Sequence, residues 1–259
     1  MDPLTAFGVW MSNTSLLMIA FVLFAMSGGA FLLGLYMRRR STREVQEGDS
    51  LLMSSVLGLL ALLLSFTFAL ASDRFDARRL LVQHEANAIG ALYLRAQLLE
   101  EPYRTRIRHA VATYTANRIT LAKAGPQRRP SLLIENDRLL RQVWSESAAA
   151  FGSIRGIDFS STFYDSVNDV IAMDGMRKSA RRAHVPPVIF VVLFLYVASS
   201  AAMLGFFART KRGLLQSGFF LLLLQVFLLA IVDIDQPTLG SIRESQEPME
   251  NMRTTLQME

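Results

Sequence analysis

The stretch that most constrains the fold runs from Leu51 to Leu99 and contains no proline. Its first part, residues 51–72, carries no charged side chain and is long enough to cross a bilayer as a helix. From Asp73 onward the pattern becomes amphipathic, and the next proline is Pro102. We therefore predict one continuous helix, about 70 Å long at 1.5 Å per residue, whose first half spans a membrane and whose second half lies in water.

Three further apolar blocks complete a membrane-spanning pattern. They run from Ser15 to Met37, from Pro186 to Ala208 and from Leu214 to Val232. The last two are joined by five residues only, so they must form an antiparallel hairpin. The sequence predicts an all-α integral membrane protein with four transmembrane helices and a helical extramembrane domain between the second and third spans.

Between the second and third spans the apolar residues recur with helical spacing, and no strand-like alternation is present. The chain thus divides into five segments. These are an N-terminal segment with the first span and a short loop (1–50), the long second helix (51–99), a helical extramembrane domain (100–185), the hairpin of spans three and four (186–232) and a polar C-terminal tail (233–259).

Composition excludes several classes of function. The chain has no Cys and three His without a shared motif, so disulfides, thiolate chemistry and a zinc site are not expected. We find no nucleophile and base arrangement and no glycine-rich phosphate loop, so we predict neither catalysis nor a cofactor. Much of the arginine behind the net charge of +5 flanks the apolar blocks, which indicates a lipid bilayer rather than nucleic acid as partner.

Charge does not determine the orientation in the membrane. Four spans place both termini and the large domain on one side and the two short loops on the other. The short loops carry seven basic residues (Arg38, Arg39, Arg40, Arg43, Arg209, Lys211, Arg212), and the domain carries seven near its membrane ends (Arg74, Arg78, Arg79, Arg177, Lys178, Arg181, Arg182). Because the counts are equal, the positive-inside rule leaves both orientations open.

Two motifs carry a resemblance to a known family. The run Leu-Ser-Phe-Thr-Phe-Ala-Leu-Ala-Ser-Asp-Arg-Phe-Asp-Ala-Arg-Arg at 64–79, continuing into Glu85–Gly90, resembles the uncharacterised bacterial bestrophin-like membrane protein family. It is also similar, more distantly, to bestrophin channels, in which a spanning helix ends in an Asp-Arg-aromatic run and continues into a cytoplasmic helix. Asp233–Pro237 is similar to the acidic-Asn-Pro segment that follows the last span in bacterial bestrophins.

The resemblance implies a homopentameric channel for inorganic ions in a bacterial inner membrane, with the large domain in the cytoplasm. It also implies that the second span lines a hydrophobic neck. The corresponding positions here are Phe66, Leu62 and Gly58, of which Gly58 departs from the bulky residue expected. Without the resemblance, these side chains would be interpreted as facing lipid or another helix.

Charged residues at the end of this span are candidates for a pore vestibule, namely Arg74, Arg78 and Glu85. The alternative is helix-surface pairing, such as Asp76 with Arg79, together with phosphate anchoring and, for Glu85, a bond to a neighbouring helix. Asp233 and Asp235 lack the further oxygen ligands of a hand-type calcium site, so we expect them to cap the fourth span.

Two functions from different classes remain. No Asp, Glu, Lys, Arg or His lies inside any apolar block, which argues against a pump but suits a channel closed by dewetting at an apolar constriction. The first hypothesis is therefore a bestrophin-like oligomeric ion channel. The second is a non-conducting membrane-anchored sensor or scaffold protein whose helical domain binds a ligand or partner.

Overall fold

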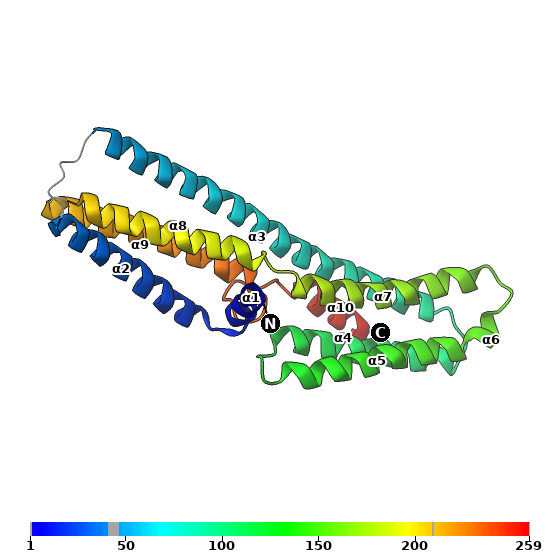
Figure 1. The fold of residues 1–259 in the computed structure, drawn as a ribbon. Coiled ribbons are helices and arrows are strands. Elements are labelled where there is room, and N and C mark those ends of the chain that lie inside the picture. The colour runs from blue at the N-terminus through cyan, green and yellow to red at the C-terminus, as the bar shows by residue number, and fades with distance from the viewer. Residues whose placement is uncertain (1, 41–46, 209, 259) are drawn as a thin grey trace. The chain divides into compact units, whose positions relative to one another are not determined.

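The protein, analysed as a computed structural model described over residues 2–40, 47–208 and 210–258, is all-helical in these ranges, with no strand. The predicted fold class is confirmed (Figure 1). The chain divides into two compact units. The membrane unit comprises Met1–Arg74 and His184–Arg243, and the helical unit comprises Phe75–Ala183 and Glu244–Glu259.

Four helical stretches within the described residues are long and apolar enough to cross a membrane: Leu16–Arg40, Leu51–Ala96, Phe159–Phe207 and Lys211–Asp235. The membrane unit holds their apolar parts, in α2 (Leu16–Arg40), the first part of α3 (Glu47–Ala96), α8 (Pro187–Phe207) and α9 (Lys211–Asp235), together with the short α1 (Pro3–Asn13). The four predicted spans are thus all helical.

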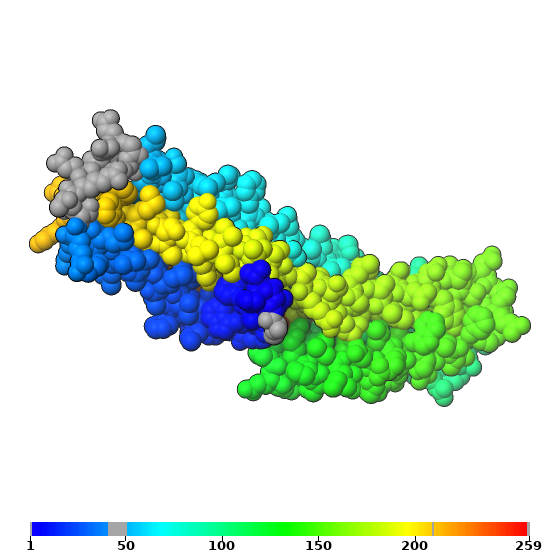
Figure 2. All heavy atoms as spheres, viewed as in Figure 1, coloured from blue at the N-terminus to red at the C-terminus, as the bar shows by residue number. Residues whose placement is uncertain are grey.

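Helices α2 and α8 pack closely along their lengths, as the blue and yellow surfaces of Figure 2 show. A Cβ atom built on Gly34 would lie 2.0 Å from the carbonyl oxygen of Ala202, and one on Gly205 would lie 2.1 Å from that of Phe31. These glycines therefore allow the two backbones to touch, as small residues do in membrane helix pairs. Gly28, also in α2, has nothing within 4 Å of its built Cβ.

Helix α3 is continuous from Glu47 to Ala96, as the absence of proline predicts. At 1.5 Å per residue, its 50 residues extend about 75 Å. The apolar part, through Ser72, belongs to the membrane unit, and the part from Phe75 onward belongs to the helical unit.

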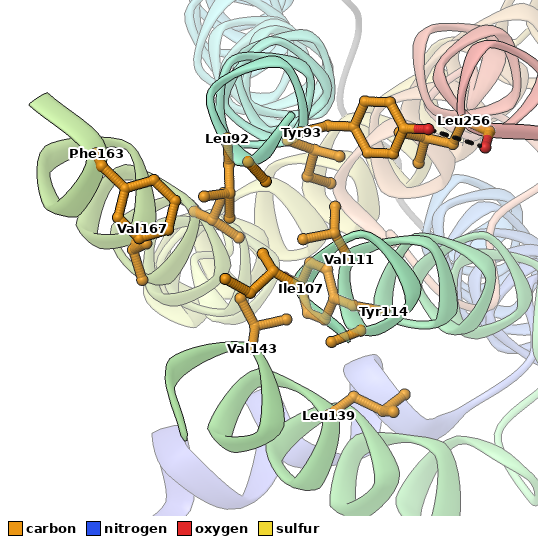
Figure 3. Close-up of a cluster of buried hydrophobic side chains, with 14 of the residues drawn as sticks. Leu92, Tyr93, Ile107, Val111, Tyr114, Leu139, Val143, Phe163, Val167 and Leu256 are labelled. Carbon is orange, nitrogen blue, oxygen red and sulfur yellow. Dashed lines mark hydrogen bonds between the residues drawn. The ribbon is translucent and has the colours of Figure 1, made fainter. Parts of the chain in front are cut away.

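Proline and glycine set the helix boundaries of the helical unit. Pro102 precedes α4 (Tyr103–Lys123), Gly125 and Pro126 follow it, and Pro130 lies in the first turn of α5 (Arg129–Ala149). The short α6 (Phe151–Ile154) and the long α7 (Phe159–Arg182) follow. Apolar side chains from these elements and from α3 form one buried core, shown in Figure 3 (Leu92, Ile107, Val111, Tyr114, Leu139, Val143, Phe163, Val167).

The C-terminal segment is not only a polar tail, because residues Glu247–Met258 form helix α10. Met249 and Leu256 are 0% and 7% exposed and belong to the core of the helical unit. The Tyr93 hydroxyl donates a hydrogen bond of 3.4 Å to the Leu256 carbonyl oxygen (Figure 3). Because these apolar residues stand among polar ones at helical spacing, the segment folds only where a partner covers that stripe.

Candidate functional site

The apolar half of α3 has one covered and one uncovered side. Leu60, Leu64, Thr67 and Ala71 recur every three or four residues and are all buried in the membrane unit. On the other side of the helix, Leu62 and Phe66 are 51% and 62% exposed. Gly58 is also exposed, with nothing within 4 Å of its built Cβ. The three predicted neck residues therefore lie on a side of α3 that no other described part of the chain covers.

Hydroxyl groups on this part of α3 are bonded within the helix itself. Ser65 Oγ donates to the Ala61 carbonyl oxygen at 2.9 Å, and Thr67 Oγ1 donates to that of Leu63 at 2.7 Å. Hydroxyls bonded in this way need no outside partner. The uncovered side is consequently apolar in its chemistry, as a constriction that controls hydration requires.

The three candidate vestibule residues occupy different environments. Arg74 is half-buried, and its Nε is buried without a hydrogen-bond acceptor among the described residues. Arg78 is 3% exposed and donates from Nε to Glu244 Oε1 at 2.8 Å. Glu85 is fully buried within the helical unit. The structure therefore does not bring the three charges together on one exposed surface.

Glu85 lies at the centre of a buried ion cluster. Nε of Arg118 lies 2.8 Å from its Oε1, and the Tyr114 hydroxyl donates to the same oxygen at 2.7 Å. Arg118 Nη2 donates to Oε2 at 3.0 Å, and Arg177 also donates to Oε2. Burial alone would raise the pKa of the Glu85 carboxyl, but the charges of Arg118 and Arg177 outweigh it and hold the pKa below its ordinary value.

A second carboxylate extends this cluster. Asp174 Oδ1 lies 3.2 Å from Arg118 Nη1 and accepts a hydrogen bond of 2.9 Å from Asn136 Nδ2, while Lys178 Nζ lies 2.5 Å from Oδ2. Sequence reasoning missed this network. A signal was present, because Arg118 follows Tyr114 by four residues and so lies on the apolar side of its helix, where an unpaired charge is costly.

The carboxylates of Asp233 and Asp235 accept hydrogen bonds that fix the backbone around the end of the fourth span. Both carboxylate oxygens of Asp233 accept hydrogen bonds from Ser241, one from the backbone N–H at 2.5 Å and one from the hydroxyl. Asp235 Oδ1 accepts from the Val185 N–H at 2.9 Å, and Gln236 Nε2 donates to the Met11 carbonyl oxygen at 2.7 Å. In the part of the chain that the structure describes, no group of His, Cys, Asp and Glu is placed to hold a metal ion.

Comparisons with known proteins agree with this architecture. A family model described as the Bestrophin-like domain matches residues 18–249. A crystal structure of a bacterial bestrophin homolog from Klebsiella pneumoniae, carrying one substitution, superposes with a TM-score of 0.62 at 15% identity, covering 94% of this chain and 98% of that one. A crystal structure of a membrane protein variant gives 0.64 at 15% identity, covering 94% and 96%. No curated protein matches this chain.

The four apolar spans and the shared fold define an integral membrane protein of the all-helical class. Since the family model covers most of the sequence, the chain belongs to the Bestrophin-like family. The resemblance inferred from the 64–79 run and from Asp233–Pro237 is thereby confirmed.

Proposed function

We propose that the protein is an ion channel, formed by copies of this chain arranged as a ring, with α3 of each copy lining the pore. Family membership supports this proposal, and the resemblance argues for five copies, a bacterial inner membrane and a cytoplasmic helical unit. The observation that carries it is the uncovered side of α3, on which Gly58, Leu62 and Phe66 are exposed.

The exposure of α3 is shared with another spanning helix. The apolar windows of α3 and α2 are each 17% buried, compared with 39% for that of α9, so a pore is inferred for α3 because this helix continues into the helical unit. A helix that only faces lipid would not need to continue into a folded domain. Helices that line a pore enclose a path for ions, and their continuation extends that path beyond the membrane. In a ring, Leu62 and Phe66 form an apolar constriction that gates by dewetting.

In this proposal the vestibule follows the neck along α3. Arg74 lies where the apolar half of α3 ends and the vestibule begins, and its side chain is half-buried. Arg78 and Glu85 contribute through the ion pairs that hold the surrounding helices, because both side chains are buried. No transported ion needs to contact either of them.

Planar-bilayer recording of the purified, reconstituted protein tests the proposal. We expect Phe66→Ala to raise single-channel conductance or open probability, because a smaller side chain lowers the dewetting barrier. Phe68→Ala is the matched control. Its ring lies on the other side of α3 and packs on Phe227 at 5.7 Å, so its removal should leave the unitary conductance unchanged.

Two outcomes would contradict the proposal. An assembled, reconstituted parent that never conducts under any ion gradient would leave the membrane-anchored sensor or scaffold as the better hypothesis. Equal effects of Phe66→Ala and Phe68→Ala would place the neck elsewhere. Mass measurement of the protein in detergent, run beside the recordings, reports whether a ring is present.

A further inference from the structure

The membrane unit contains an apolar pocket of about 340 Å³, lined by residues of α1, the start of α8 and the end of α9. Apolar side chains from the three helices line it, such as Val9, Phe190 and Val232, together with the polar residues Asp235 and Gln236. Small-molecule sites have volumes of about 300–1,000 Å³ and combine an apolar wall with a few polar groups. The pocket therefore has the size and the composition of a site for a small ligand.

Gln236 contributes a buried acceptor that lacks a donor. Its side chain is 3% exposed, and Nε2 donates a hydrogen bond of 2.7 Å to the Met11 carbonyl oxygen. Because a carbonyl oxygen only accepts, this bond fixes which end of the amide is nitrogen. The other atom, Oε1, is buried and has no hydrogen-bond partner among the described residues. Since an unpaired buried acceptor is unfavourable, the site favours a molecule that brings a donor.

The carboxylate of Asp235 is buried beside this acceptor in the sequence and is only partly paired. It is 5% exposed, and Oδ1 accepts a hydrogen bond of 2.9 Å from the Val185 N–H. His184 Nδ1 lies 3.5 Å from Oδ2 but 3.1 Å from the Asp235 carbonyl oxygen. A neutral imidazole that donates from Nδ1 to the carbonyl oxygen satisfies the shorter contact. A buried carboxylate is costly without a positive charge beside it, and a neutral His184 supplies none.

We propose that this pocket binds an organic cation, namely a primary amine with an apolar body, such as an arylalkylamine. The ammonium group carries a positive charge and three N–H donors, so it matches both the Asp235 carboxylate and the Gln236 acceptor. The apolar body then displaces water from the wall formed by Val9, Phe190 and Val232. The inference does not rest on the proposed function, because it concerns binding and not conduction.

Other classes of ligand fit these residues less well. A metal ion such as Ca²⁺ requires six or more oxygen ligands, whereas most of the pocket wall is apolar. A carboxylate or phosphate ligand would be repelled by Asp235, and the described residues that line the pocket include no lysine or arginine to bind it. A neutral alcohol supplies a donor but leaves the buried charge without a counter-charge.

The fluorescence of Trp10 provides the test, because this residue lies in α1 between Val9 and Met11, which both line the pocket. The chain has two tryptophans, so Trp144→Phe leaves Trp10 as the reporter. The full-length protein in nanodiscs is titrated with phenethylamine, with the neutral phenethyl alcohol and with the anionic hydrocinnamate. We expect a saturable change in emission with the amine and a much weaker response to the other two probes.

Two variants locate the binding site of the amine. Asp235→Asn keeps an oxygen for the Val185 N–H but loses the charge, so it should weaken amine binding by about tenfold or more. Asp2→Asn is the matched control. It removes an exposed carboxylate at the start of α1 that does not line the pocket, and it should leave the affinity unchanged.

Equal responses to the three probes would show that they merely partition into the lipid, and this result would overturn the inference. An Asp235→Asn protein that binds the amine as tightly as the parent would overturn it as well. If Asp235→Asn does not fold, the comparison of the three probes on the parent still decides. A response to calcium chloride without any response to the amine would assign the pocket to an inorganic cation and contradict the proposal. None of these results depends on whether the protein conducts ions.

Discussion

At the residue scale, Glu85 shows how a charge can be held inside a small helical unit. It has no exposed surface, and its two oxygens are shared among Tyr114, Arg118 and Arg177. Burying a charge is costly unless it is paired and hydrogen-bonded, and here both conditions are met. The three partners come from two different helices, so the carboxylate joins α3 to α4 and α7.

Replacing this carboxylate should destabilise the helical unit strongly. Glu85→Gln leaves two guanidinium groups buried without their counter-charge, which costs about 3–5 kcal/mol for a buried pair. We expect a clear fall in the thermal unfolding midpoint of the purified protein. Glu135→Gln serves as the control, because Glu135 pairs with Arg138 on an exposed helix surface and should matter little. Equal midpoints for both variants would show that the buried cluster does not hold the unit together.

At the element scale, the sides of the spanning helices α3 and α2 have different surroundings. The covered side of α3 packs in the membrane unit, and the other presents the neck residues. Helix α2 contacts α8 through a glycine on each helix, where the backbones approach too closely for a Cβ atom. Of two glycines in α2, Gly34 therefore serves helix packing, whereas Gly28 has no neighbour within 4 Å of its built Cβ.

A pair of alanine substitutions separates these two glycines. Gly34→Ala places a Cβ against the Ala202 carbonyl oxygen, and forcing such contacts typically costs 1–3 kcal/mol, so we expect about 2 kcal/mol of lost stability. Gly28→Ala meets open space and should leave stability unchanged or slightly raised. Unfolding midpoints in detergent report both. A stable Gly34→Ala protein would mean that α2 and α8 can separate without cost.

At the scale of the whole molecule, the chain returns to the helical unit after its last span. Glu244 bonds Arg78 of α3 at 2.8 Å and Arg181 of α7 at 3.2 Å. Helix α10 then adds Met249 and Leu256 to the core. The helical unit is consequently completed by residues that are distant in sequence from the rest of it.

Removing residues 244–259 should therefore loosen the helical unit. The deletion exposes the apolar surface that Met249 and Leu256 cover, worth about 3 kcal/mol or more, and leaves Arg78 without Glu244. We expect faster proteolysis within residues 75–183, mapped by mass spectrometry. Glu250→Gln, which removes only an exposed partner of Lys123, is the control and should be cleaved like the parent. Unchanged protection of the truncated chain would show that the return segment is dispensable.

Some features of the fold could be predicted from the sequence, and others could not. The four spans, the long α3 and the boundaries of α4 and α5 were predictable, because apolar block length and the positions of proline and glycine act locally. The placement of Gly58, Leu62 and Phe66 on one side of α3 follows from helical periodicity. Helical periodicity does not predict whether another segment of the chain covers that side. Among the described residues, the structure shows that it is uncovered.

What the sequence alone determined is the class of protein: a helical membrane protein with a proline-free helix that runs from the membrane into an extramembrane unit. What the tertiary structure decided is which charges are exposed and which are paired. Arg118 and Arg177 reach Glu85 across 33 and 92 residues of chain, and Glu244 reaches Arg78 across 166. Periodicity records only which side of a helix a residue occupies, whereas the burial and pairing of a charge depend on which distant segment packs there.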